Sequence, residues 1–441
     1  MKRSFIAVPR PLVTTAIALI TAFGMTPAGV TQSTCTVSAA SGAPDATFNA
    51  AATQNGPGTG NEPSGSPGWT GADSTYSLLL ANGNTAFFYS DSYIGQSPAL
   101  GGDGTVTTNA NGLRTRVPNC NPPLCNPATN VYRAHNSIVV RNPTTGALTT
   151  KVGPNDAYGY STSFFNPTNT VHFYWMGDSV VVQVDSAGTK KVWAFLLEFD
   201  SSWVYYGSAI AQLSLPNLTI DSITPLTNVP AGNTTNWGSS MWLDGGYGSY
   251  YLYIYGVNGS QPYIALTNPA LGVSGIANTN NWFVANSSRG WVTGLNNAAP
   301  VIGGPSDTNN AGDKISNEYS VKKLTSSAGT TYLLVAEDTK PAFGTQTNIV
   351  FYSACSPQGP FSAKDVVYST PETGAKTVPG MTSGQQLTGA LLTYNPHAHP
   401  QFTSNGSLLV SYDLNSSNGA DLVYADAYRP KFVRVPIAGL H

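Results

Sequence analysis

The sequence predicts an all-β protein, a five-bladed β-propeller in a single domain, and three observations lead to this prediction. Charged residues make up only 10% of the 441 residues, against 45 Gly, 31 Pro and 23 Tyr, which is typical of many short strands and turns. About five units of similar make-up follow one another, each passing from a polar strand to apolar, aromatic ones. No amphipathic helix of useful length separates the strands, which argues against a parallel α/β fold. A pair of β-sandwiches is the main alternative, but the chain has no Gly/Pro linker between two halves.

The N-terminus predicts export from the cell. Residues 1–32 read as a signal peptide, because basic residues precede an apolar run over residues 12–23 that is too short to span a bilayer comfortably. Residues 33–67 are rich in Ser, Ala, Gly, Pro and Asn, and predict a flexible, extended arm without its own core. The propeller domain is then residues 68–441. We expect a secreted, extracellular protein with no membrane association after signal cleavage.

The first unit, residues 68–95, predicts a β-hairpin. Two aromatic-rich runs flank Asn82-Gly83, a strong short-range signal for a tight hairpin turn. Each run carries one aspartate at the end away from the turn, so antiparallel pairing should bring Asp73 and Asp91 close together. Aspartates at strand ends often only cap turns, whereas a pair of carboxylates can also serve sugar chemistry.

The later units continue the ring. They cover residues 158–200, 236–266, 315–355 and 391–435, and in the first of these Gly177-Asp178 predicts a turn. In a propeller, polar residues at the starts of the innermost strands converge on one end of the central channel. Polar groups beside apolar strands are costly unless they bond to each other, to water or to a ligand. The candidates for such positions are Asp73, Asp91, His135, Asn136, His172, Asp178, Trp237, Ser239, Asn317, Glu318, Asn395, His397 and His399.

The four cysteines predict disulfides. Cys120 and Cys125 bracket a short turn-forming segment and are expected to pair, which leaves Cys35 and Cys355 for a long-range bridge. A metal site is the alternative, but the spacing lacks the Cys-x-x-Cys pairs that zinc sites favour, and disulfides suit a secreted chain.

Charge excludes one class of partner. The net charge of −2 and the pI near 6.2 give no electrostatic footprint for nucleic acid. We expect a monomer whose partner is a polysaccharide or oligosaccharide.

Several motifs together resemble a known family. In chain order they are residues 69–77 (WTGADSTYS), 89–92 (YSDS), 135–137 (HNS), 237–239 (WGS), 317–321 (NEYSV), 352–361 (YSACSPQGPF) and 394–400 (YNPHAHP). The set resembles a family of bacterial and fungal secreted proteins labelled as a domain of unknown function, some of whose members are endo-D-arabinanases that cut mycobacterial arabinan. The resemblance covers nearly the whole mature chain. It implies a five-bladed propeller akin to the arabinanase and levansucrase glycosidases.

The function expected from this resemblance is that of a secreted glycoside hydrolase. Its substrate would be an extracellular or cell-wall polysaccharide, and an endo-acting arabinofuranan hydrolase is the finer expectation. The alternative is a non-catalytic carbohydrate-binding propeller, and a scaffold with a merely structural channel is a third. Sugar hydrolysis by two carboxyl groups needs a general acid with a raised pKa and a base or nucleophile.

Residue roles follow from position. Asp73 begins the first inner strand and is expected to be the base or nucleophile, Glu318 the general acid, and Asp91 a helper that orients the sugar or tunes the acid. The residues expected to hydrogen-bond sugar hydroxyls are His135, Asn136, Asn317, Asn395 and His399. Trp69 and Trp237 are expected to stack on a sugar ring.

Other roles stay open for two of these side chains. Glu318 could instead form an ion pair with Lys322, and His399 could make a structural hydrogen bond. No cofactor is expected, although a channel cation such as calcium, held by His399 and carboxylates, is a further alternative.

Overall fold

The structure is a computed structural model that describes residues 35–53, 68–95, 106–116, 133–154, 156, 161–305, 307–326, 329–339, 345 and 347–440. The predicted signal peptide and the predicted Cys120–Cys125 pair lie outside these residues. Within these ranges, no helix is long and apolar enough to cross a membrane.

Five antiparallel sheets confirm the predicted propeller, and each forms one blade. Blade 1 consists of β3 (Tyr76–Leu79), β4 (Thr85–Tyr89), β9 (Ser137–Arg141) and β10 (Leu148–Lys151). Blade 2 consists of β11 (His172–Gln183), β12 (Lys190–Asp200), β13 (Tyr205–Ser214) and β14 (Thr219–Pro225). Blade 3 consists of β15 (Asn236–Asp244), β16 (Tyr251–Asn258), β17 (Gln261–Thr267), β18 (Phe283–Ala285) and β19 (Trp291–Thr293).

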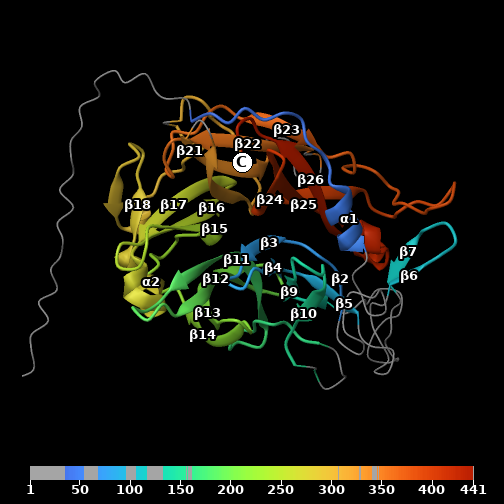
Figure 1. Ribbon diagram of the computed structural model, residues 1–441, viewed down its shortest axis with the longest axis horizontal. Coiled ribbons are helices and arrows are strands. Elements are labelled where there is room, and N and C mark those ends of the chain that lie inside the picture. The colour runs from blue at the N-terminus through green and yellow to red at the C-terminus, as the bar shows by residue number, and fades with distance from the viewer. Residues whose placement is uncertain are drawn as a thin grey trace, which may run out of the picture. The chain divides into compact units, whose positions relative to one another are not determined.

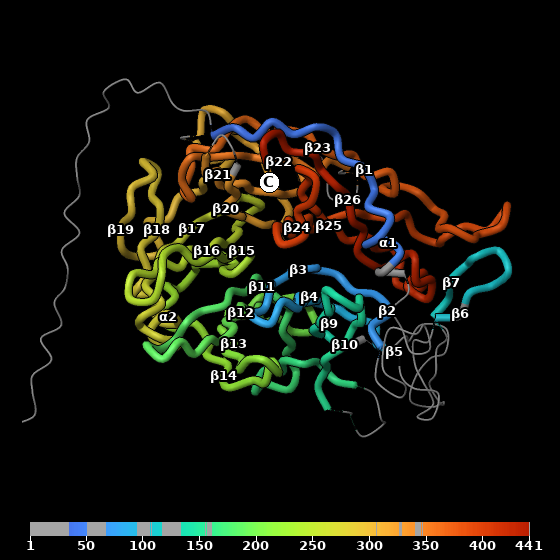
Figure 2. The backbone as a smooth tube through the Cα atoms, viewed as in Figure 1, coloured from blue at the N-terminus to red at the C-terminus, as the bar shows by residue number. Residues whose placement is uncertain are grey.

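Blades 4 and 5 complete the ring. Blade 4 consists of β20 (Ser320–Ser326), β21 (Gly329–Glu337), β22 (Asn348–Ala354) and β23 (Asp365–Ser369). Blade 5 consists of β24 (Leu391–Ser404), β25 (Ser407–Ser416), β26 (Arg429–Pro436) and the N-terminal strand β1 (Ala43–Pro44). Figure 1 shows β3, β11, β15 and β24 toward the middle, and Figure 2 adds β20 to this inner ring.

Smaller elements lie outside the blades. Two further sheets consist of β2 (Gly68–Ala72), β5 (Ser92–Gly95) and β8 (Arg133–Ala134), and of β6 (Val106–Thr108) and β7 (Arg114–Arg116). The α-helices are α1 (Ala46–Thr53) and α2 (Gly272–Ala277). The 3-10 helices are η2 (Pro269–Leu271), η3 (Thr279–Asn281), η4 (Leu295–Asn297), η5 (Gly419–Val423) and η6 (Ala425–Ala427).

The first hairpin forms, but its strands divide between two sheets. The strands β3 and β4 pair around the Asn82-Gly83 turn, while their extensions β2 and β5 pair in the separate small sheet. The chain changes sheet at Ser74, whose φ of 69° is uncommon for a residue with a side chain. Ser90 N donates to the carbonyl of Asp73 over 3.0 Å, so the ends of the two runs lie side by side as predicted.

The predicted turn at Gly177-Asp178 is wrong. Residues 172–183 form one continuous strand, β11, and its pairing with β12 shifts between Met176 and Ser179 in a β-bulge. Similar shifts occur in β15 between Trp237 and Ser240 and in β24 between Tyr394 and His397. A bulge changes the direction of side chains without ending the strand, so Gly177-Asp178, a pair typical of turns, lies within a strand of the blade.

The N-terminal arm is more ordered than predicted. It contributes β1, which pairs with β26 on the outer edge of blade 5, and it contributes α1. Phe48 of α1 packs in the core against Phe402 and Phe432, and Asp45 bonds Arg434 over 2.7 Å. The first and last described segments therefore close the ring together.

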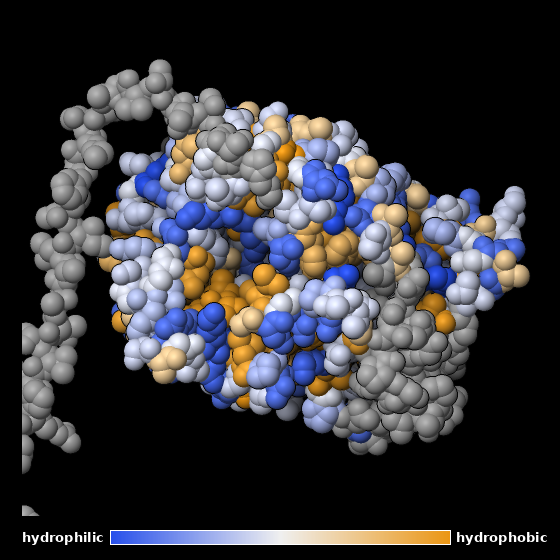
Figure 3. All heavy atoms as spheres, viewed as in Figure 1, coloured by the Kyte–Doolittle hydropathy of each residue, from blue (hydrophilic) through white to orange (hydrophobic). Residues whose placement is uncertain are grey.

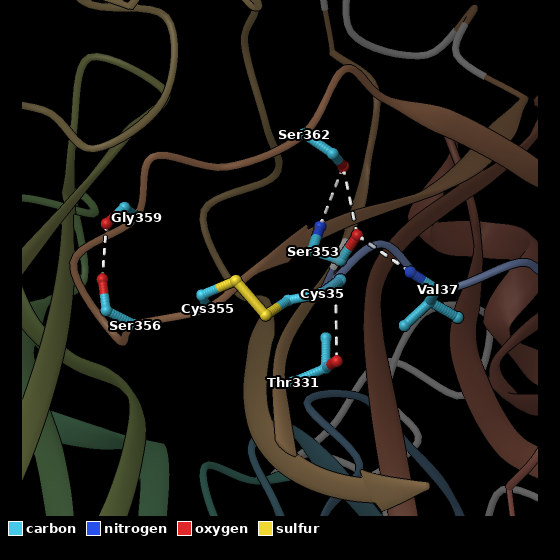
Figure 4. Close-up of a disulfide and its surroundings, with 8 residues drawn as sticks. All are labelled: Cys35, Val37, Thr331, Ser353, Cys355, Ser356, Gly359 and Ser362. Atoms are coloured by element: carbon cyan, nitrogen blue, oxygen red, sulfur yellow. Dashed lines mark hydrogen bonds between the residues drawn. A yellow bond between two sulfur atoms is a disulfide. The ribbon is translucent and has the colours of Figure 1, made fainter. Parts of the chain in front are cut away.

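A disulfide fixes the same arm to blade 4. Cys35 and Cys355 are bonded, the pair that the sequence predicts, and they lie 320 residues apart in the chain. Two hydrogen bonds support the junction: Val37 N donates to Ser353 Oγ, and Thr331 Oγ1 donates to the carbonyl of Cys35 (Figure 4). The arm thus crosses from blade 4 to blade 5.

Apolar packing between neighbouring sheets makes the core. Large side chains such as Trp193, Phe195 and Tyr255 are fully buried between blades. On the face seen in Figure 3, hydrophobic residues also gather in a hollow near the middle, whereas hydrophilic ones dominate the rim. The blades are therefore held by face-to-face burial of apolar surface.

We predict that Gly71→Ala destabilises the fold. A Cβ on Gly71 would lie 2.1 Å from Arg116 Nη2 and 2.3 Å from the carbonyl oxygen of Tyr428. Arg116 is fully buried and donates to the carbonyls of Thr70, Leu422 and Tyr428, so it cannot move without leaving donors unpaired. Overpacking of this kind lowers the free energy of unfolding by about 1–3 kcal/mol, and thermal denaturation measures the loss.

Gly246→Ala is the matched control, since a Cβ there meets nothing within 4 Å. Equal melting temperatures for the two variants would contradict the prediction.

Candidate functional site

Ser74 joins the carboxyl groups at one end of the channel. Its backbone N–H donates to Asp413 Oδ2 over 2.7 Å, and its Oγ donates to Glu318 Oε1 over 2.9 Å. The same Oγ lies 2.6 Å from Ser90 Oγ, which accepts from Met176 N. One residue at the start of β3 therefore links blade 1 to side chains from around the ring.

Asp91 pairs with a histidine that reaches the surface. Asp91 Oδ1 lies 2.9 Å from His135 Nδ1, and their side chains are 5% and 31% exposed. The His135 ring stacks on Phe173 at a centroid distance of 3.9 Å, and Tyr428 Oη donates to the carbonyl of Asp91. His135 thus lies between a buried carboxyl group and solvent.

Asp73 is half-buried and bonded to a tyrosine. Tyr394 Oη donates to Asp73 Oδ2 over 2.9 Å, and Asn415 Nδ2 donates to Tyr394 Oη over 3.1 Å. Burial, followed by the charges of Asp73 and Asp413, raises the pKa of Tyr394 well above its usual value, so its hydroxyl keeps its proton and acts as a donor.

Two buried carboxyl groups have raised pKa values. Burial raises the pKa of Glu318 well above its usual value, and the charges of Asp73 and Asp91 raise it further, against the bond from Ser74. Burial and the charge of Asp73 raise the pKa of Asp413 in the same way. Both groups retain protons at a pH where ordinary carboxyl groups have lost them, so the site combines buried acids with the more exposed Asp73.

The environment of Glu318 excludes the alternative that this residue forms an ion pair with Lys322. Lys322 pairs with Asp178 over 2.8 Å, not with Glu318. The nearest basic group to Glu318 Oε2 is His397 Nε2 at 3.7 Å, and burial lowers the pKa of His397 well below its usual value. Glu318 therefore faces a neutral imidazole.

His399 and Asn136 are structural in this arrangement, which corrects their predicted contact with sugar. The two ring nitrogens of His399 lie 2.6 Å from Ser77 Oγ and 2.9 Å from Ser411 Oγ, and burial lowers its pKa to about 3. Asn136 Nδ2 donates to the carbonyls of Phe165 and Tyr174. With both His399 nitrogens engaged, the channel-cation alternative loses its histidine ligand.

The two predicted stacking residues lie in the core, so this prediction is also corrected. Trp69 and Trp237 are each 1% exposed. Trp69 stacks on Tyr89 and Trp237 packs edge-to-face on Trp282. A ring covered on both sides has no free face for a sugar.

The two predicted asparagines differ in exposure. Asn317 is exposed and its carbonyl accepts from Ser239 Oγ, whereas Asn395 is buried in the bulge of β24 with a φ of 50°. Asn317 remains available to a ligand beside Glu318.

The sequence interpretation missed Asp413 and Tyr394. Asp413 stands within the apolar strand β25 (Ser407–Ser416), and a lone acid inside a buried strand is a usable signal, because burial must be compensated. Across the described ranges, no three His, Cys, Asp or Glu side chains form a group that could hold a metal ion.

Comparisons with known proteins agree with this architecture. A family model described as a domain of unknown function, DUF5005, matches residues 64–437. No curated protein matches the chain. A provisionally assigned hydrolase from Bacteroides ovatus is similar in structure at 18% identity, with a TM-score of 0.61 and 89% of each chain covered.

Two further solved structures are more distant. An exo-β-1,3-galactanase from Phanerochaete chrysosporium has a TM-score of 0.41 at 9% identity, over 82% of this chain and 60% of that one. A GH43_1 enzyme from Xanthomonas citri, complexed with xylotriose, has a TM-score of 0.41 at 10% identity, over 82% and 87%.

We predict that Asp413→Asn flattens the pH dependence of stability. Because the folded-state pKa of Asp413 is raised, its contribution is full below the unfolded pKa and is lost as pH rises toward the folded value. The wild-type melting temperature should fall as pH rises above about 3.9, the ordinary pKa of an aspartate, and the fall should be smaller in the variant. An asparagine can still accept from Ser74 N and can donate to Thr75 Oγ1.

The control is Asp221→Asn, since bonds from Ser214 and Lys191 lower the pKa of that exposed carboxyl group. Substitution of Asp221 should leave the fall of the melting temperature with rising pH unchanged. An unchanged slope in the Asp413 variant would refute the prediction.

Proposed function

The chain belongs to the family described as domain of unknown function DUF5005, and on that premise we propose that it is a secreted glycoside hydrolase. The observation that carries the proposal is the position of Glu318, which is buried and bonded to Ser74 next to the half-buried Asp73, where its pKa is raised. A protonated acid and a carboxylate at one site are the two groups that glycosidic hydrolysis requires. The fold shared with the Bacteroides ovatus protein, itself named as a hydrolase, agrees with this class.

In the proposed reaction Glu318 supplies a proton to the glycosidic oxygen. The bond between that oxygen and the anomeric carbon breaks, and the leaving sugar departs as an alcohol. Asp73 acts on the other side of the sugar, either by taking a proton from the attacking water or by bonding the anomeric carbon first. In both courses one water is consumed and its hydroxyl goes to the anomeric carbon. In the first course the water's proton goes to Asp73, and exchange with solvent then returns both carboxyl groups to their starting protonation. In the second course the proton goes to the Glu318 carboxylate and restores the acid.

The remaining residues position these groups. Tyr394 holds Asp73 by its hydrogen bond, and Ser74 holds Glu318. Asp91 contributes negative charge that keeps Glu318 protonated, and His135 orients Asp91. The bond from Tyr394 therefore fixes the direction in which the Asp73 carboxylate faces a substrate.

The proposed substrate is an extracellular or cell-wall polysaccharide. The finer proposal, an endo-acting arabinofuranan hydrolase, rests on the motif resemblance around Asp73, Glu318 and Tyr394. Secretion rests on the basic and apolar N-terminal pattern, and the Cys35–Cys355 disulfide agrees with an oxidising compartment.

A non-catalytic carbohydrate-binding propeller is the second candidate. The observation that favours it is the burial of Glu318, whose side chain is only 9% exposed and is bonded to Ser74. A general acid must contact the glycosidic oxygen of the substrate, and this burial limits the access of a substrate to Glu318.

We predict that Asp73→Asn and Glu318→Gln each reduce hydrolysis of arabinan by about 10²–10⁴-fold, the usual contribution of a general acid or base. The two variants should differ on an aryl arabinofuranoside with a good leaving group. That substrate needs no protonation, so Glu318→Gln should regain activity on it and Asp73→Asn should not. Release of the aryl group and of reducing ends measures both.

Asp365→Asn, an exposed change on β23, is the control for general effects. If Asp91→Asn shows the leaving-group pattern in place of Glu318→Gln, the acid is Asp91. Binding without cleavage of arabinans, fructans and other cell-wall glycans by the wild type would favour the second candidate.

A further inference from the structure

An aromatic surface lies at one edge of blade 2, at the site end of the ring. Strand β11 begins at His172, which pairs with Asp200 at the end of β12, and β13 begins at Tyr205. We define the aromatic surface as Phe173, Trp175 and Trp203, whose rings contact one another. Trp203 is 51% exposed, which is unusual for a side chain of this size, while Trp175 is half-buried and Phe173 is buried beside them.

Ring contacts make this surface rigid. The Trp203 ring lies 5.0 Å from Trp175 and 5.7 Å from Phe173, centroid to centroid. Beneath them Phe199 packs against Trp175 and Tyr205, in a small cluster separate from the cores between blades. A supported aromatic face loses little conformational entropy when a ligand covers it.

The turn that carries Trp203 has an uncommon backbone conformation. Trp203 has a φ of 64°, in the left-handed region that bulky residues avoid. Asp200 holds the turn: its Oδ1 accepts from Ser202 N and Val204 N, and its Oδ2 accepts from Tyr206 Oη. Glycine or asparagine would suit this backbone better, so the structure keeps a tryptophan exposed at a conformational cost.

The aromatic surface continues directly into the candidate site. Phe173 stacks on His135, with the rings inclined by 14°, and His135 bonds Asp91. Strand β11 itself passes the site, since Met176 N donates to Ser90 Oγ next to Asp91. A ligand that lies against His135 would come next to the exposed Trp203 ring, because both rings contact Phe173.

The chemistry of the rim favours a sugar chain. The carboxylate of Asp200 lies in the turn that carries Trp203, where its Oδ1 accepts from Ser202 N and Val204 N. Aromatic faces pack against the C–H faces of sugar rings, and carboxylates accept bonds from sugar hydroxyl groups. An uncharged, hydroxyl-rich polymer uses both features.

We propose that the aromatic surface is an outlying subsite that binds sugar units of a neutral polysaccharide, several units away from the bond that is cut. The identity of the ligand rests on the proposed function. The surface then determines preference for long chains over short ones.

The test compares Trp203→Ala with the wild type in two assays. In affinity electrophoresis through gels containing soluble arabinan, the dissociation constant should rise about tenfold on loss of one stacked ring. In hydrolysis, the ratio of kcat/KM for long to short arabino-oligosaccharides should fall by a similar factor, mostly through KM. Trp203→Phe should restore most of both.

Tyr247→Ala is the matched control, because Tyr247 is 50% exposed in the β15–β16 turn, at the opposite end of its blade. Its electrophoretic retardation should equal that of the wild type. Equal melting temperatures for the variants would show that loss of binding is not loss of fold.

The outcomes separate the inference from the proposed function. If the wild type binds the polymer without cutting it, and Trp203→Ala weakens that binding, the subsite stands and the hydrolase proposal fails. If Trp203→Ala cuts and binds long chains as the wild type does, the inference is overturned. A dimer that Trp203→Ala converts to a monomer in sedimentation would also overturn it, because the surface would then serve self-association.

Discussion

The hydrogen bonds of Ser74 connect ring closure with the site. Its backbone bonds Asp413 of blade 5 and its hydroxyl bonds Glu318 at the entry to blade 4, so the start of blade 1 is fixed by groups that come late in the chain. A left-handed backbone at Ser74 makes both bonds geometrically accessible. Because the same bonds place two buried acids next to Asp73, fold stability and carboxyl chemistry depend on one set of contacts.

The β-bulges in the inner strands show how the ring tolerates polar groups at its centre. In β11 the bulge directs Asp178 toward Lys322 and Met241 N, and Gly177 there lies so close to Gly238 of the bulge in β15 that a Cβ would reach its carbonyl at 2.6 Å. In β24 the bulge precedes His397, which faces Glu318. The bulges in β11 and β24 thus interrupt the ladder where a polar side chain, Asp178 or His397, meets a partner from another blade.

The sequence alone predicted the ring, the first hairpin, the proximity of Asp73 to Asp91 and the Cys35–Cys355 pairing, because these follow from strand patterning and turn chemistry. It could not predict which side chains are buried at the inner ends of the blades. Trp69 and Trp237 belong to motifs that suggest a sugar contact, yet other blades cover them, and only packing between segments far apart reveals this. Tyr394 and Asp413 were missed for the same reason: their partners Asp73 and Ser74 come more than 300 residues earlier.

The pairing of β1 with β26 has a consequence for biogenesis. The outermost strand of blade 5 is made first, and the three strands that it completes are made last. While the chain is being synthesised, this early segment has no sheet to join, and it can pair only after β26 has been made. The last step of ring assembly therefore waits for β26, and a chain truncated before β26 would expose a strand edge that favours aggregation.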